Sequence, residues 1–227
     1  MRPLVLAVLA FGGWISTAST FETPKIKYPY QSAPFNLIVL SSNSTLNGTH
    51  LYSCHEGAAI QGLCTNSSRH IREGPNPRPI EPYNMRYFLN YTDGSEGERS
   101  PTKEARSGIL TWAFEHMTVS CAMKLRNGWN GFCSNVITPL FTPGDHNSDI
   151  VAFDGDNKLC IWNWRDEAVL PTWQNRNYEQ TAYYNWYICM TNVGYLFETL
   201  TWVSGGEPVN PSCQKVDILR VPEGSHS

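Results

Sequence analysis

The sequence predicts a disulfide-stapled all-β protein with one compact domain, built as a β-trefoil-like fold or as a Greek-key barrel or sandwich. Three observations predict it. Eight short segments are rich in β-branched and aromatic residues, and Pro, Gly, Asn and Ser fill the gaps between them. No segment has the length and 3.6-residue period of a long amphipathic helix. Seven cysteines follow a leader typical of exported proteins.

Residues 1–18 have the features of a signal peptide. Arg2 supplies a positive start, the apolar run PLVLAVLAFGGWI follows, and Ser16 and Ala18 are small residues at the cleavage positions. The run is shorter than the roughly 20 residues of a membrane span, and no second run of this kind follows. We expect cleavage after Ala18 and secretion into the extracellular space, with association with the cell wall as one outcome.

The length of the remaining chain fits a single domain of ordinary size. We expect an N-terminal extension at 19–34, one all-β domain at 35–222 and a polar tail at 223–227. Without Arg2 the formal charge changes from −3 to −4, which argues against nucleic acid or an anionic membrane as a partner. The sequence gives no indication of the oligomeric state.

The expected strands alternate apolar and polar positions. Thr111 stands between Leu110 and Trp112, and 199–202 alternates in the same way, which predicts one wet and one dry face. The eight segments are FNLIVL (35–40), RYFLNY (86–91), ILTWAFE (109–115), DIVAF (149–153), KLCIW (158–162), NWYICM (185–190), ETLTWV (198–203) and QKVDILRV (214–221).

The clearest hairpin joins DIVAF to KLCIW through the turn 154–157, Asp-Gly-Asp-Asn. These oxygen donors also suggest a calcium loop, but the twelfth position of such a loop, which needs glutamate, is Arg165. A turn is therefore expected and no metal site. Three strand-rich blocks, 35–91, 108–164 and 183–221, are separated by polar segments, which favours a threefold architecture, although they share no internal motif.

The stretch CHEGAAIQGLC places Cys54, His55 and Glu56 together, as in a metal site or an activated nucleophile. In an oxidising compartment, Cys54 and Cys64 are expected to form a disulfide instead, closing a small loop worth roughly 2 to 3 kcal/mol. The other sequential pairs are Cys121–Cys133 and Cys189–Cys213. Cys160 remains as a packed thiol, and spacing alone does not fix the connectivity.

Four N-glycosylation sequons lie in the first half of the chain, at Asn43, Asn47, Asn66 and Asn90. Glycans are bulky and soluble, so an occupied sequon must lie on an exposed loop or turn. We expect at least two of the four to be occupied, and we expect the second half of the chain to be bare.

Several spaced motifs carry a resemblance, namely FNLIVLSSNSTLNG with CHEGAAIQGLC, LFTPGDHNSDIVAFDGDNKLCIW, and YLFETLTWVSGGEPVNPSCQKVDILRV. Together they resemble an uncharacterised domain of small secreted proteins of filamentous fungi, similar in layout to cell-wall and IgE-binding-type proteins of moulds. The resemblance covers roughly 35–221. It implies secretion and an all-β fold and brings no activity or catalytic residue, and Cys160 is where departure from its pattern is expected.

Aromatic residues are concentrated in 162–187, which holds eight Trp or Tyr. Such rings stack on the apolar faces of sugars. We expect Trp162 and Trp186, which lie in strands, to belong to the core, while Trp173 lies in a polar loop and is the first candidate for sugar contact. The candidate ligand-binding residues are Trp173, Trp164, Tyr178 and Tyr183.

The predicted function is that of a secreted, N-glycosylated, non-catalytic protein that is wall-associated or binds polysaccharide weakly. An alternative is an effector or allergen that contacts a host surface component. A small hydrolase is the third hypothesis, with candidates among Glu115, His116, Asp145, His146 and Asp149. Glu115 and His116 would point to opposite faces of an extended strand, and a polar loop such as 145–149 is usually an ordinary turn. No catalytic residue and no cofactor is assigned.

Overall fold

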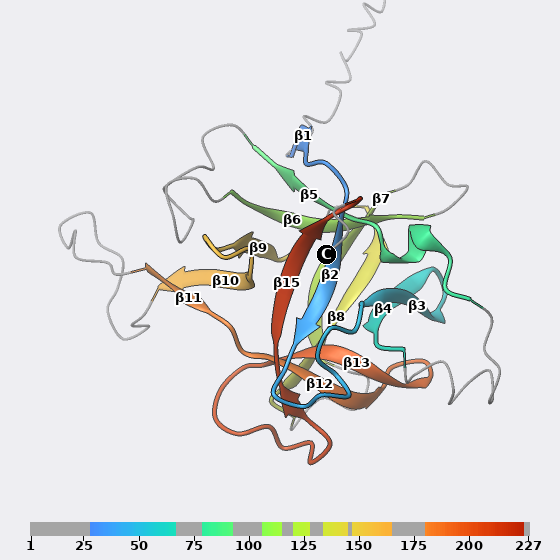
Figure 1. Cartoon of the computed structure of the whole chain (residues 1–227), viewed down its shortest axis with the longest axis vertical. Helices are drawn as coiled ribbons and strands as arrows, with labels where there is room; N and C mark the ends of the chain where they lie inside the picture. The colour runs from blue at the N-terminus through green and yellow to red at the C-terminus, as the bar shows by residue number, and fades with distance from the viewer. Residues whose placement is uncertain are drawn as a thin grey trace, which may run out of the picture.

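The structure, a computed structural model, describes residues 28–66, 79–92, 106–114, 120–127, 134–144, 147–164 and 180–224 (Figure 1). These residues form one curled antiparallel sheet, and a short 3₁₀ helix, η1 (Pro82–Met85), accompanies it. The expected all-β domain is thereby confirmed. Within the described ranges, no helix has the length and hydrophobicity to span a membrane.

The strands follow the chain in this order: β1 (Tyr30–Gln31), β2 (Phe35–Leu40), β3 (Tyr52–Gly57), β4 (Ile60–Cys64), β5 (Tyr87–Tyr91), β6 (Ser107–Ala113), β7 (Ser120–Asn127), β8 (Val136–Pro143), β9 (Ile150–Phe153), β10 (Leu159–Trp164), β11 (Gln180–Tyr183), β12 (Trp186–Asn192), β13 (Leu196–Val203), β14 (Gln214–Lys215) and β15 (Asp217–Pro222).

Six of these strands close into a ring. Strand β2 pairs with β5, β5 with β6, β6 with β9, and β9 with β10. A bridge between Lys158 and Leu219 joins the start of β10 to β15, and β15 returns to β2. The first and last long strands of the domain are therefore neighbours, which leaves no open edge along this ring.

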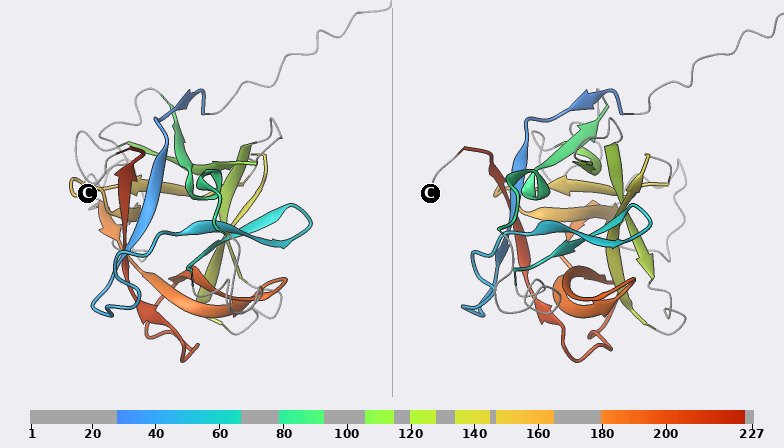
Figure 2. Two further views of the ribbon diagram at one scale, coloured as in Figure 1. Left: turned by 45° about the vertical axis from the view of Figure 1, so that its right-hand side comes forward. Right: turned by 90° about the vertical axis from the view of Figure 1, so that its right-hand side faces the viewer.

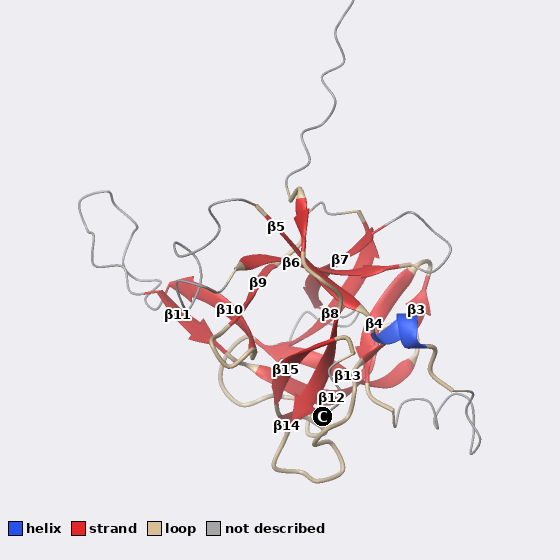
Figure 3. Ribbon diagram, turned by 45° about the horizontal axis from the view of Figure 1, so that its top comes forward, coloured by secondary structure: helices blue, strands red, loops and turns tan. Residues whose placement is uncertain are grey.

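Three hairpins, β3–β4, β7–β8 and β12–β13, complete the fold (Figures 2 and 3). Each hairpin pairs with both of the others, through β4 with β8, β4 with β13, and β8 with β13. Each of three successive units thus supplies one ring strand, one hairpin and a second ring strand. This connectivity is that of a β-trefoil, the first of the architectures that the sequence predicted.

The unit boundaries differ from the three blocks expected from the sequence. The second unit ends at β9, and β10 is the first ring strand of the third unit. The DIVAF–KLCIW hairpin, whose Asp154–Asn157 turn is present as expected, therefore joins two units. The turn chemistry was correctly predicted, but a tight hairpin does not indicate on which side of it a repeat ends.

Several strands are buried on both faces, although the sequence predicted one buried face and one face exposed to water. Thr111 is 1% exposed and Thr201 is 0% exposed. The hydroxyl of Thr111 donates to the Phe88 carbonyl at 3.3 Å, and that of Thr201 donates to the Tyr187 carbonyl at 3.2 Å. Buried hydroxyls are tolerated when they are hydrogen-bonded, so the alternating pattern identified the strands but not the exposure of their second face.

Two expected loops contain strands. CHEGAAIQGLC forms the hairpin β3–β4, in which Ala58 and Ala59 make the turn, and β7 occupies the start of the second cysteine-flanked segment. Strand β8 contains Pro139 and Pro143, residues that argue against a strand when only the sequence is read. Pairing across the hairpins compensates for this weak local preference.

Candidate functional site

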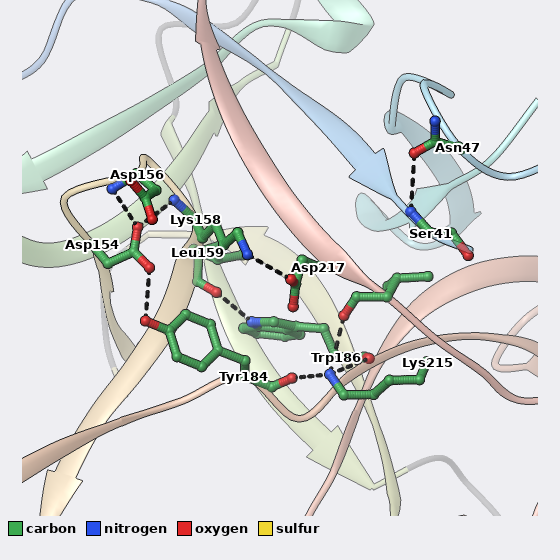
Figure 4. A network of polar contacts seen from close by, with 11 residues as sticks. Ser41, Asn47, Asp154, Asp156, Lys158, Leu159, Tyr184, Trp186, Lys215 and Asp217 are labelled. Carbon is green, nitrogen blue, oxygen red and sulfur yellow. Dashed lines mark hydrogen bonds and ion pairs between the residues drawn. The ribbon is translucent and has the colours of Figure 1, made fainter. Parts of the chain in front are cut away.

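A polar network surrounds the turn between β9 and β10 (Figure 4). One oxygen of the Asp154 carboxylate accepts the backbone N–H groups of Asp156 and Lys158 at 2.9 and 2.8 Å. The other oxygen accepts the Tyr184 hydroxyl at 2.7 Å. Asp154 therefore fixes its own turn and also the segment between β11 and β12.

A second part of the network joins this turn to the C-terminal strands. Lys158 forms an ion pair with Asp217 at 2.9 Å, and the Lys215 ammonium donates to the carbonyls of Tyr184, Trp186 and Val216. The two charged groups of the ion pair are about one-third exposed, so their attraction contributes little by itself. Their combined effect is to hold the base of β10 and β12 against β14 and β15.

Burial shifts the pKa values of Tyr184 and Lys215 in this network. Burial, followed by the hydrogen bond and charge of Asp154, raises the pKa of Tyr184 far above its ordinary value. Burial lowers the pKa of Lys215, partly offset by the charge of Asp217. At neutral pH Tyr184 is thus a neutral hydrogen-bond donor. The network has its polar groups paired with one another, which is the arrangement of a structural clamp.

The clamp positions a two-stranded ribbon, β10–β11, which extends away from the ring (Figure 1). Ile161 is paired with Tyr183, and both side chains pack against the main core. Trp162 is opposite the small Ala182 and is half-buried; because neighbours alternate along a strand, it lies on the face away from Tyr183. The expected core position of Trp162 is therefore only partly met, whereas Trp186 is fully buried as expected.

The four predicted ligand-binding residues have different positions. Tyr183 contributes to core packing, and Trp164 is the last residue of β10. Trp173 and Tyr178 lie outside the described residues, so their role as surface contacts stays a prediction. The described part of the ribbon brings Trp162 and Trp164 to alternate positions of one strand, a spacing that the aromatic count alone did not single out.

A disulfide decides between the two interpretations of Cys54, His55 and Glu56 in CHEGAAIQGLC. Ligand atoms of Cys54, Glu56 and Cys64 lie within 4.8 Å of one another, close enough to suggest a metal site. However, Cys54 and Cys64 are bonded to each other, so neither offers a thiolate. The carboxylate of Glu56 instead accepts backbone N–H groups from the loop before β13. The stapled structural interpretation is thereby supported over the metal site.

The other cysteines are only partly as expected. Cys189 and Cys213 form the second disulfide of the described residues. Cys121 differs from the expectation, because it is a free thiol in β7 that faces the main core; its expected partner Cys133 lies outside the described residues. Cys160 is a buried free thiol, as expected, and it donates to the Ala152 carbonyl.

A family model described as a domain of unknown function, DUF7907, matches residues 32–222. The chain belongs to this family. The match begins just before β2 and ends with β15, so the DUF7907 domain is the complete trefoil with its ribbon. No curated protein matches the chain, and no solved structure matches it.

The hydrolase candidates of the DUF7907 domain do not form a described site. Asp149 accepts the backbone N–H of Leu125, and its own N–H donates to Met123, so it serves to hold β7 beside the start of β9. Glu115, His116, Asp145 and His146 lie outside the described residues. The one candidate whose contacts are visible therefore has a structural role.

Cys160 gives the DUF7907 domain a predicted sensitivity to alkali. Burial raises the pKa of Cys160 from its ordinary value of 9.0 to about 12, and the charge of Asp154 adds to the shift. The folded protein retains a proton that the unfolded chain releases as the pH rises from 9 to 12. The free energy of unfolding should fall in this window, by up to about 1.4 kcal/mol per pH unit from this thiol.

Urea unfolding at several pH values from 8 to 11 checks this expectation. Because Lys215 and the buried tyrosines also titrate in alkali, the comparison is made with Cys160→Ala, which removes only the thiol. The variant should lose stability less steeply with rising pH than the wild type. Equal slopes would show that Cys160 does not titrate as its burial requires.

The structure distinguishes the four sequons of the DUF7907 domain. Asn47 and Asn66 are exposed. Asn43 is half-buried, and its amide donates to Gln214 at 2.6 Å. Asn90 is a half-buried residue of β5, between β1 and β6, and its amide oxygen accepts from Gln31 at 2.9 Å. A bulky glycan fits the first two sites best.

We expect glycopeptide mapping of protein from its native host to find glycans on Asn47 and Asn66 and none on Asn90, because a glycan on Asn90 would interfere with pairing of β1 and β5. All released glycan mass should come from peptides that end before Asp93. An occupied Asn90 in folded protein would contradict the structural argument, and unmodified Asn47 and Asn66 would contradict glycosylation of the first half.

Proposed function

We propose that the protein is a secreted, N-glycosylated, non-catalytic protein that binds a cell-wall polysaccharide weakly through the β10–β11 ribbon. The observation that carries the proposal is the ribbon itself, which extends from the ring with the half-buried Trp162 on the face opposite to Ile161 and Tyr183. Exposed aromatic residues on a stable surface commonly mark contact sites, and aromatic rings suit the apolar faces of sugars.

The clamp at its base supports this role for the ribbon. Hydrogen bonds and an ion pair connect the two strands to the ring. Asp154 accepts hydrogen bonds from the Tyr184 hydroxyl and the Lys158 N–H, and the Lys158 ammonium forms the ion pair. A contact surface that is already ordered loses less conformational entropy on binding. In the sequence, residues 165–179 connect β10 to β11 and contain Trp173 and Tyr178.

The expected affinity is low. A stacked ring contributes on the order of 1 kcal/mol, so two or three rings give a dissociation constant nearer millimolar than nanomolar. This range suits retention on an insoluble polymer, where many equivalent sites are close together, and the resemblance to secreted fungal domains suggests glucan or chitin as the polymer.

We expect Trp173→Ala and Trp162→Ala each to weaken retention on insoluble glucan or chitin by about fivefold, the loss of roughly one stacked ring. Trp173→Ala should leave the melting temperature almost unchanged. The matched control is Tyr30→Ala, since Tyr30 is an exposed ring that lies on β1 rather than on the ribbon. Retention is measured by depletion of protein from the supernatant.

Unchanged retention in both tryptophan variants would exclude the ribbon as the contact surface. A large loss of stability in Trp173→Ala would show that Trp173 is a core residue and not a surface contact. Fractionation of the producing culture separates the wall-associated interpretation from the effector or allergen interpretation: recovery in the wall fraction supports the former, and accumulation in the medium or on a host surface supports the latter.

A further inference from the structure

The loop between β13 and β14, residues 204–213, protrudes at the bottom of the view in Figure 1. Its sequence is SGGEPVNPSC. Val209 is 62% exposed, more than any other large hydrophobic residue that the structure describes. The chain bends at Val209, so this exposed side chain lies at a turning point of the loop.

One side chain from outside the loop fixes its first half. Asn135, which precedes β8, donates from its amide nitrogen to the carbonyls of Gly205 and Glu207 at 2.7 and 2.8 Å. Its amide oxygen accepts the backbone N–H of Val209 at 3.0 Å. One amide side chain thus uses both its donors and its acceptor on three alternate residues of the loop. The backbone that leads to Val209 is therefore held in one shape.

Contacts with β12 fix the second half of the loop. The side-chain amide of Asn210 donates to the Met190 carbonyl at 2.8 Å. The disulfide between Cys189 and Cys213 joins the end of the loop to the same strand. The loop is therefore anchored on both sides of Val209, and a loop that is already ordered loses less conformational entropy when it binds a partner.

The backbone at Val209 is open to a partner. Its carbonyl accepts no hydrogen bond from the residues that the structure describes. Pro208 and Pro211 restrict the φ angles on either side of it. A serine endopeptidase binds an exposed side chain in its specificity pocket and the adjacent carbonyl in its oxyanion hole. Val209 offers both groups on a backbone of fixed shape.

We propose that residues 207–211 occupy the active-site cleft of a serine endopeptidase with a small apolar specificity pocket, and that Val209 fills this pocket. Valine fits such a pocket, whereas a pocket with an acidic base requires a basic side chain. Because the N–H of Val209 already donates to Asn135, recognition depends on the side chain and the carbonyl. The inference adds a protein partner and does not rest on polysaccharide binding.

The anchors favour inhibition of the enzyme over digestion of the loop. Asn135 holds the chain before the Val209–Asn210 peptide bond. The Asn210 side chain and the Cys189–Cys213 disulfide hold the chain after it. Both sides of this bond therefore keep their positions in the cleft, and protease–inhibitor complexes commonly form with little backbone movement. The loop should block the cleft without being released as fragments.

The test follows the hydrolysis of chromogenic peptides by pancreatic elastase and by trypsin, with the full mature chain added as the inhibitor. We expect a roughly micromolar or lower inhibition constant for elastase, and inhibition of trypsin that is about 100-fold weaker. Val209→Arg should reverse this preference by a similar factor, because the trypsin pocket requires a basic side chain. Leu196→Arg is the matched control: Leu196 is 50% exposed in β13, and its replacement should leave both inhibition constants unchanged.

Asn135→Ala tests the anchors while it keeps Val209. Elastase inhibition should weaken about tenfold, and mass spectrometry should detect faster cleavage after Val209. A wild-type protein that does not inhibit elastase, or that is cleaved in the loop without inhibiting it, would overturn the proposal.

Inhibition that Val209→Arg leaves unchanged would overturn the assignment of Val209, and full inhibition by Asn135→Ala would overturn the role of Asn135. Melting temperatures establish that each variant is folded. Val209→Arg should be retained on insoluble glucan or chitin as well as the wild type is, so failure of this proposal and failure of the ribbon proposal are distinguishable.

Discussion

Replacing Trp186 by alanine should lower the free energy of unfolding by about 3 to 5 kcal/mol. Trp186 is fully buried and packs edge-to-face against Trp202, with ring centroids 4.7 Å apart. Its indole N–H donates to the Leu159 carbonyl at 2.8 Å, which ties the third hairpin to ring strand β10. The substitution leaves both a cavity and a carbonyl without its donor.

Trp186→Phe is the matched variant, because it keeps an aromatic ring and removes the indole N–H. Its free energy of unfolding should lie between those of the wild type and Trp186→Ala. Equilibrium denaturation by urea measures all three proteins. A loss below about 1 kcal/mol in the alanine variant would mean that the third hairpin does not depend on this contact.

Replacing Gly194 by alanine should cost about 2 to 4 kcal/mol, although it adds a single methyl group. The new Cβ would overlap the carbonyl oxygen of Glu56, so the loop before β13 must move away from β3. That movement breaks the N–H contacts of the buried Glu56 side chain, and the loss of hydrogen bonds to a buried polar group is costly.

Gly205→Ala is the control for Gly194→Ala. Nothing lies within 4 Å of a Cβ at Gly205, so this substitution should change stability by less than about 0.5 kcal/mol. Urea midpoints and m-values of both variants are compared with the wild type. Equal tolerance at the two positions would contradict the close approach of Gly194 to β3.

The strands of the ring were predictable because their patterns are local. Strand β2, Phe35–Leu40, coincides with the predicted segment, since its alternate residues face a core. Strand β3 was missed because Cys54, His55 and Glu56 suggested cysteine chemistry and lack strand preference. Its pairing with β4 and the contacts of both hairpins supply the stability that its own residues do not.

The candidate sites show the same limit. The aromatic density of 162–187 was visible in the sequence. Of the two ribbon strands, β10 overlaps a predicted segment and β11 does not. The contact between the hairpins β3–β4 and β12–β13 depends on Glu56 and Gly194, which are 138 residues apart and carry no local signal of their contact. The burial of Thr111 was likewise unpredictable, because a polar residue in an alternating strand usually faces water.

Incubation of the wild-type protein with insoluble β-glucan and with chitin tests the central claim most directly. Protein remaining in the supernatant and reducing ends released from the polymer are measured in the same samples. Weak, saturable retention on at least one polymer is expected, with no increase in reducing ends over a sample without protein. Release of reducing ends would contradict the non-catalytic assignment, and a lack of retention on both polymers would contradict polysaccharide binding.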